Sequence, residues 1–380
     1  MRSFEPAMVE QVDIFIQQLG RLRDQPVDVK SRCSYLSFDI IGLLSFGYSL
    51  HLQTQQENRF LVEQLARSTH RMNVCMQIPV ISRYKLHVYI NKFFQQEREK
   101  TARLIETMIR SRMAEDVNAK RDLYSFVAEA VNAKDDEGLQ LYIGGDTSAT
   151  ALSATLFYLS RNLKSYAKLA AEIRTTFQSA DEICVSKLTG CQYLRACIDE
   201  SLRMSPPSPG TLWRELAPEE EGGKPFVVDG HIIPHGTKYP VLLWPSPPRS
   251  SRDYLRVTTK QEYFHDPFTY NPDRWLETRD SKEGGTSRKA MHDAFAAFSI
   301  GSRGCAGKPM AYLELSLALA KTFWYFDFET APGKLGDVGL GQKGEFHLYD
   351  IFTSTHDGPY LAFTARDSFL RDFGDAEGQD

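Results

Sequence analysis

Long apolar runs, blocks of one charge and paired cysteines are all missing from this sequence of 380 residues. The net charge of −4 and the lack of any lysine/arginine block argue against a nucleic-acid binder. The six cysteines form no Cys-x-x-Cys pair and no regular framework, so we expect reduced thiols. With 42% hydrophobic residues, the composition is that of an ordinary globular protein with a large core.

No stretch is apolar enough to predict a membrane span. Residues 1–20 lack the continuous apolar core of a signal peptide and show apolar residues at helical spacing instead. The most apolar stretch, "SYLSFDIIGLLSFGYSL", carries Asp39 and four serines, whereas a span needs about 20 predominantly apolar residues. We therefore expect a buried helix there and no membrane anchor in the sequence as it stands.

The character of the chain changes near Pro206. Up to about Arg203, runs such as "FLVEQLARSTHRMNVCM" predict helices. Beyond it, residues 225–237 predict two short strands joined by an Asp-Gly turn, residues 310–326 a strong helix, and residues 346–363 closing strands. Because there is no repeat and no parallel doubly wound pattern, the predicted fold class is mainly α with a smaller β part (α+β).

One cysteine has an unusual setting, the stretch "FSIGSRGCAG" (298–307). Gly301 and Gly307 permit a tight turn and a close approach to something flat or bulky. Pro309 suits the first turn of a following helix, which places Cys305 just before a helix N-terminus, where a thiolate is favoured. One thiolate cannot build a tetrahedral zinc site, but it can be the single protein ligand of a haem iron. The alternative is a packed cysteine in a glycine turn.

This stretch carries a family resemblance. It matches the signature Phe-x-x-Gly-x-Arg-x-Cys-x-Gly of the cytochrome P-450 monooxygenases at Phe298, Gly301, Arg303, Cys305 and Gly307. The resemblance implies the cytochrome P-450 fold, with haem b as cofactor, Cys305 as the axial iron ligand and the other four residues in its binding loop. It also implies O2, a small hydrophobic organic substrate and electrons from NADPH. A separate NADPH-cytochrome P-450 reductase would supply these electrons, because no flavin or nicotinamide motif is present here.

Two further segments fit a structural charge network of this family. "DESLR" places Glu200 and Arg203 three residues apart on one helix face, where the two side chains can pair. By resemblance, Arg274 of the later "NPDRW" segment is the third member. Most such pairs are solvated surface charges, but apolar neighbours indicate that this helix is partly buried. We predict one buried network that locks the loops behind the haem thiolate and takes no part in catalysis.

The stretch "IGGDTSAT" (143–150) places Gly144 and Gly145 inside a helical pattern, at about 1 kcal/mol each relative to alanine. It resembles the segment of the family's long helix that crosses the oxygen-binding face. The resemblance implies that Asp146 and Thr147 are the acid–alcohol pair that relays protons to dioxygen, and that Gly144 leaves room for oxygen and water. The alternatives are a phosphate loop, which lacks its lysine here, and a serine/threonine-rich bend with a surface aspartate.

The last predicted cofactor contact is Arg214, in "GTLWREL". The family has a strand arginine at this place that binds a haem propionate, and Arg303 would make the same charge-assisted contact. His231 and His235 are four residues apart, but the glycine and proline around them exclude a shared helix face. No metal other than iron is predicted.

The resemblance spans residues 1–366, interpreted as a single incomplete P-450 domain that lacks the family's N-terminal region. Residues 238–260 are rich in proline, serine and arginine and are predicted to be an atypical insertion outside the core. The sequence before Ile143 is charged where the family is apolar. A gene-model error is the hypothesis for all three departures. Residues 367–380 are predicted to be a disordered tail.

Several functions stay open at this point. The resemblance favours O2- and NADPH-dependent hydroxylation or oxidation of a small molecule, in the style of fungal secondary metabolism. The alternatives are a truncated, inactive haem-binding remnant and a haem-thiolate peroxidase or isomerase that needs no reductase. The resemblance implies the cytosolic face of the endoplasmic reticulum membrane, and a chain without an anchor could be cytoplasmic. The substrate cannot be derived from the sequence.

Overall fold

The structure is a computed structural model. It describes residues 4–23, 25–78, 80–81, 84, 95–114, 137–209, 211–214, 227–228, 230–232, 239–242, 260–276, 288–299 and 304–374. Within these ranges helices dominate and the sheets are small and antiparallel. The predicted fold class, mainly α with a smaller β part, is confirmed.

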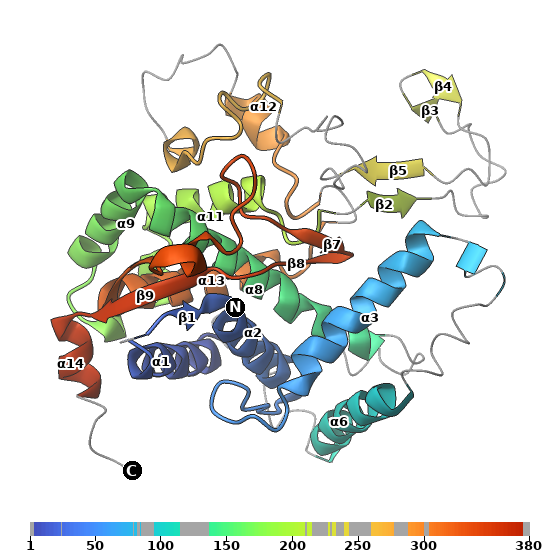
Figure 1. Ribbon diagram of the computed structural model, residues 1–380, viewed down its shortest axis with the longest axis horizontal. Coiled ribbons are helices and arrows are strands. Elements are labelled where there is room, and N and C mark those ends of the chain that lie inside the picture. Colours follow the sequence, from blue (N-terminus) through green and yellow to red (C-terminus); the bar gives the residue numbers. More distant parts are fainter. Residues whose placement is uncertain are drawn as a thin grey trace.

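The helices bury one large apolar core and two smaller apolar clusters. They are α1 (Glu5–Arg21), α2 (Val29–Phe46), α3 (Phe60–Gln77), α6 (Gln95–Met113), α8 (Glu137–Arg161), α9 (Leu163–Thr176), α10 (Val185–Leu188), α11 (Gln192–Met204), α12 (Arg288–Asp293), α13 (Lys308–Tyr325) and α14 (Asp367–Phe373). Figure 1 shows α8 crossing the middle of the molecule, and α2 packs along it. Helices α11 and α13 also contact α8. No helix in the described part of the chain is both long and apolar enough to cross a lipid bilayer.

The two glycines of α8 have different surroundings, although the helix continues through both. A Cβ at Gly145 would lie only 3.3 Å from side-chain atoms of Phe38 and Ile41 on α2 and 3.4 Å from the Ser37 carbonyl oxygen. A side chain at 145 would therefore make tight contacts with α2, which glycine avoids where α2 and α8 approach closely. Gly144 is exposed, and a Cβ there would make an ordinary 3.6 Å contact with Ile41.

The strands form short antiparallel sheets. The largest sheet has the order β1 (Val27–Asp28), β9 (Tyr360–Ala365) and β6 (Phe326–Thr330). The pairs are β2 (Thr211–Arg214) with β5 (Tyr239–Leu242), β3 (Val227–Val228) with β4 (His231–Ile232), and β7 (Tyr349–Ile351) with β8 (Thr353–Thr355). The strands predicted on either side of the Asp-Gly turn and near the C-terminus are confirmed.

Two predicted boundaries differ from the structure. Residues 367–373 of the predicted disordered tail form α14, because Phe369 is only 2% exposed and its ring lies directly against Gly20 of α1. Residues 239–242, the start of the predicted insertion, form β5 and pair with β2. Residues 243–259 lie outside the described residues, so the insertion remains a prediction for them.

Candidate active site

Cys305 lies in the loop that leads into α13, two residues before the N-cap residue Gly307. Pro309 occupies the first turn of the helix, as predicted. The Cys305 N–H donates a 2.8 Å hydrogen bond to the Phe298 carbonyl oxygen and closes the loop. A Cβ at Gly307 would lie 3.8 Å from the Cys305 Sγ, so Gly307 and the thiol are neighbours. The predicted position of Cys305 ahead of a helix N-terminus is confirmed.

Among the six cysteines, only the side chain of Cys305 is exposed. Burial raises the pKa of the Cys33 and Cys197 thiols well above the ordinary value, and such thiols are inert. Within the described residues, no three histidine, cysteine, aspartate or glutamate side chains gather as a metal site. The Cys305 thiol therefore fits a metal group that brings its other ligands with it, as haem does.

Aromatic contacts tie the cysteine loop to α13 and α11. The Phe298 ring packs on the Tyr312 ring of α13, with 5.0 Å between the ring centroids. The Tyr312 hydroxyl donates to Asp199 of α11, and the Arg195 guanidinium lies 3.5 Å from the Tyr312 ring centroid. Arg195 in turn pairs with Asp199 at 3.0 Å. The loop that carries the thiol is thus held from behind by the helix that also carries Glu200.

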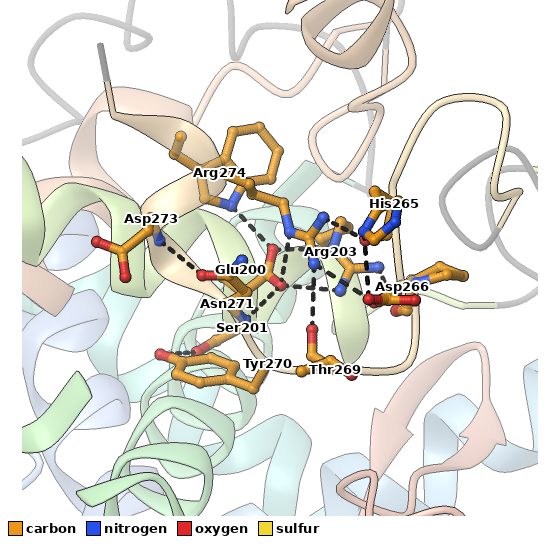
Figure 2. Close-up of polar contacts among 12 residues, drawn as sticks. Glu200, Ser201, Arg203, His265, Asp266, Thr269, Tyr270, Asn271, Asp273 and Arg274 are labelled. Atoms are coloured by element: carbon orange, nitrogen blue, oxygen red, sulfur yellow. Dashed lines mark hydrogen bonds and ion pairs between the residues drawn. The ribbon is translucent and has the colours of Figure 1, made fainter. Parts of the chain in front are cut away.

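The predicted charge network is present (Figure 2), and its side chains are buried. Arg203 donates two 2.9 Å hydrogen bonds to Glu200, from Nε to Oε2 and from Nη2 to Oε1. Neither side chain is exposed to solvent. Arg274 donates from Nε to Glu200 Oε1 at 3.1 Å, and its Nη1 donates to the His265 carbonyl oxygen at 2.7 Å. The prediction of one buried network of Glu200, Arg203 and Arg274 is confirmed.

Two further donors, which the sequence prediction missed, complete the shell of Glu200. The Trp275 Nε1 donates to Oε2 and the Asn271 backbone N–H donates to Oε1, both at 2.9 Å. Burial by itself raises the pKa of Glu200, but the two guanidiniums and the Asn271 N–H outweigh it, so the pKa is lowered. The carboxylate is therefore ionised and fully satisfied. Both residues lie in the "NPDRW" segment, and this was the sequence signal that could have indicated them as partners of Glu200.

Asp146 and Thr147 are neighbours on α8, and both are partly buried. The Thr147 hydroxyl donates to the Gly144 carbonyl oxygen of its own helix at 3.0 Å. Asp146 Oδ2 accepts a 2.7 Å hydrogen bond from the Thr353 hydroxyl of β8. Burial raises the pKa of Asp146, although Thr353 and the positive charge of Lys30 oppose that effect. The acid can thus hold a proton more readily than an exposed aspartate, and its role in proton relay remains a prediction.

Three predicted cofactor contacts lie beyond what the structure describes. Gly301 and Arg303 fall outside the described residues. Arg214 lies at the end of β2, paired with Tyr239 of β5, but its side chain is not among the described ones. Their contacts with a haem group stay predictions.

Sequence reasoning missed a buried carboxyl group at the junction of three helices. Glu314 of α13 is 4% exposed, and it accepts hydrogen bonds from Ser37 of α2 and Ser148 of α8. Burial raises its pKa to about 7, and the two serines only partly oppose this. The available signal was a single glutamate inside the apolar helix sequence "AYLELSLALA".

The sequence matches the cytochrome P450 family over residues 1–338. It is 31% identical over 359 residues to a cytochrome P450 monooxygenase of Gibberella zeae, covering 89% of this chain and 78% of that protein. It is 31% identical over 347 residues to cytochrome P450 monooxygenase lcsN of Purpureocillium lilacinum, covering 87% and 97%. It is also 31% identical over 386 residues to cytochrome P450 monooxygenase apf8 of Gibberella fujikuroi, covering 96% and 100%.

An exposed cysteine ahead of a long helix, together with a buried glutamate–arginine network on a neighbouring helix, fits the haem-thiolate class of site. With the family match, the chain belongs to the cytochrome P450 family. It is an oxidoreductase with haem b as its cofactor, and its similarity is to monooxygenases. The predicted family, enzyme class and cofactor are confirmed, and the inactive remnant and the peroxidase or isomerase are not favoured.

Proposed function

We propose that this chain inserts one oxygen atom of O2 into a small hydrophobic organic substrate of fungal secondary metabolism. Electrons come from NADPH through a separate NADPH-cytochrome P-450 reductase. The observation that carries the proposal is the exposed Cys305 thiol in a braced loop ahead of α13. The monooxygenase names of the fungal relatives support it. By the same resemblance we propose the cytosolic face of the endoplasmic reticulum membrane as the location.

Residues of the cysteine loop, with Arg214 of β2, would bind the cofactor. Cys305 is the residue that would ligate the haem iron, and it lies just ahead of the N-terminus of α13. Gly307 keeps the backbone close to the thiol without a side chain, while Arg214 and Arg303 pair with the propionates. When bound, haem supplies the redox chemistry that activates dioxygen.

Protons reach the reaction through α8 in this proposal. Burial raises the pKa of Asp146, so this carboxyl group takes up a proton more readily than an exposed aspartate does. The adjacent Thr147 hydroxyl can pass that proton on by rotating about its Cα–Cβ bond. Gly144 leaves the helix surface beside Thr147 open, since it is exposed and carries no side chain. The pair thus performs general acid chemistry, and neither residue has to bind the substrate.

The test measures product formed per NADPH consumed, with the reductase supplied. Thr147→Ala is expected to retain haem but to divert electrons to peroxide and water, lowering the yield about tenfold or more because a positioned acid contributes a factor of about 10²–10⁴. Asp146→Asn is expected to slow turnover without changing the absorption spectrum. Thr175→Ala is the matched control, because the hydroxyl of this exposed threonine also donates to a carbonyl oxygen of its own helix, that of Ala171 on α9. An unchanged yield in Thr147→Ala contradicts the relay.

A further inference from the structure

The hairpin of β7 and β8 turns on a single strained residue. Ile351 and Thr353 are paired across the hairpin, and Phe352 alone forms the tip with a φ of 91°. This region of backbone space is unfavourable for a bulky side chain, and strain of this kind persists only where the surroundings enforce it. The Asp350 carboxylate accepts the Phe352 N–H at 3.0 Å and fixes the tip. The fixed conformation of the tip therefore also fixes the backbone position of the next residue, Thr353.

Neighbouring elements anchor both strands of this hairpin. Asn73 of α3 donates from Nδ2 to the backbone and side-chain oxygens of Asp350, at 3.4 and 3.3 Å. On the other strand, the Ser354 N–H donates to the Pro207 carbonyl oxygen at 2.7 Å. Thr150 of α8 donates to the Ser354 carbonyl oxygen at 3.5 Å. The hairpin is thus attached to α3, to the segment after α11 and to α8.

From this position Thr353 reaches Asp146. The threonine is 1% exposed, and its hydroxyl donates to Asp146 Oδ2 at 2.7 Å. Among the described residues, Oδ1 of Asp146 accepts no hydrogen bond. Ionisable groups on α2 and α13, which pack against α8, also act on this part of the helix. Lys30 of α2 acts on Asp146 electrostatically and donates to Thr355 at 3.4 Å, and Glu314 of α13 bonds Ser148.

We propose that Thr353 is a positioning residue for proton delivery by Asp146. Its hydroxyl occupies Oδ2 and fixes the rotamer of the carboxyl group, so that Oδ1 is the oxygen that exchanges the proton. This inference rests on the proposed role of Asp146 and Thr147. Its immediate consequence is that removal of one buried hydroxyl, 206 positions from Thr147 in the chain, changes the proton affinity of the acid.

The test uses the haem-loaded protein with ¹³C-labelled aspartate carboxyls, in which the Asp146 signal is the one absent from Asp146→Asn. Thr353→Val keeps the size of the side chain and removes the hydroxyl. It is expected to move the Asp146 titration to higher pH, because the carboxylate loses a hydrogen bond worth roughly a factor of ten. Product per NADPH is expected to fall by about the same factor. Thr353→Ser is expected to restore both. Ser354→Ala is the control, because its hydroxyl is equally buried but bonds the Pro206 carbonyl oxygen.

The outcomes separate this inference from the proposed function. A Thr353→Val protein that titrates and couples like Ser354→Ala overturns the positioning role, even if Thr147→Ala is uncoupled. If Thr147→Ala stays coupled, the relay fails, and the titration shift still decides whether Thr353 controls the acid. If Thr353→Val does not fold, Thr353→Cys replaces it, because a thiol of similar size is a weak donor. The same upward shift is expected there, and its absence contradicts the proposal.

Discussion

At the scale of single residues, the buried Glu200 shows how burial decides what an ion pair contributes. Its carboxylate receives two guanidiniums, an indole N–H and a backbone N–H with no exposure to solvent. The exposed pair of Glu106 and Arg110 on α6 is even shorter, at 2.6 Å, but water screens it. Removing one partner should therefore change the free energy of unfolding much more for the buried Glu200 pairs than for the exposed Glu106–Arg110 pair.

We expect Glu200→Gln to lower the free energy of unfolding by about 3–5 kcal/mol, because it leaves buried arginines without their counter-charge. The control Glu106→Gln should change it by no more than about 1 kcal/mol. Urea unfolding and the retained haem-to-protein ratio measure both. A Glu200→Gln protein that is as stable and as haem-loaded as the control would count against the buried network.

At the scale of elements, Glu314 joins the helices that carry the two halves of the proposed site. It lies on α13, which follows Cys305, and accepts a hydrogen bond from Ser148 on α8, next to Thr147. Ser37 on α2 supplies the third attachment. A carboxyl group held only by hydroxyls favours its neutral form, because ionisation in an apolar interior has no compensating charge.

This predicts a pH dependence of stability with a definite sign. The folded pKa of Glu314, about 7, lies above its ordinary value of 4.5, so the folded protein binds the extra proton between these values. Stability should therefore fall by about 3 kcal/mol as pH rises through that window and then level off. Glu314→Gln should abolish this fall, whereas Glu329→Gln, an exposed position on β6, should keep it. Equal pH profiles for the wild type and Glu314→Gln would refute the assignment.

The lowered pKa of Glu200 acts in a different pH window. A carboxyl group with a lowered folded pKa stabilises the protein above its ordinary pKa and loses that contribution as pH falls through the folded pKa. The Glu200 contribution is thus lost below about pH 4.5, on the acid side of the window in which Glu314 acts. Unfolding measured across both windows therefore distinguishes the two residues.

At the scale of the whole molecule, the features that the sequence predicted are those encoded by neighbours in the chain. The order of glycine, cysteine and proline predicted the position of Cys305 ahead of α13, and apolar periodicity predicted α8 and α11. The hydrogen bond between Asp146 and Thr353 joins residues 207 positions apart and left no local signal. The disordered tail was predicted from charge alone, and Phe369 packing on α1 was not visible in that composition.

The most direct test of the haem-thiolate assignment is the absorption spectrum of the reduced, carbon-monoxide-bound protein. Cys305→Ala is compared with Cys184→Ala, because Cys184 is also partly accessible and its thiol pKa is lowered, first of all by a hydrogen bond to Ser186. The wild type and Cys184→Ala are expected to show the thiolate-type Soret band, and Cys305→Ala is expected to lose it. A thiolate band that survives in Cys305→Ala and disappears in Cys184→Ala would contradict the assignment of Cys305 as the iron ligand.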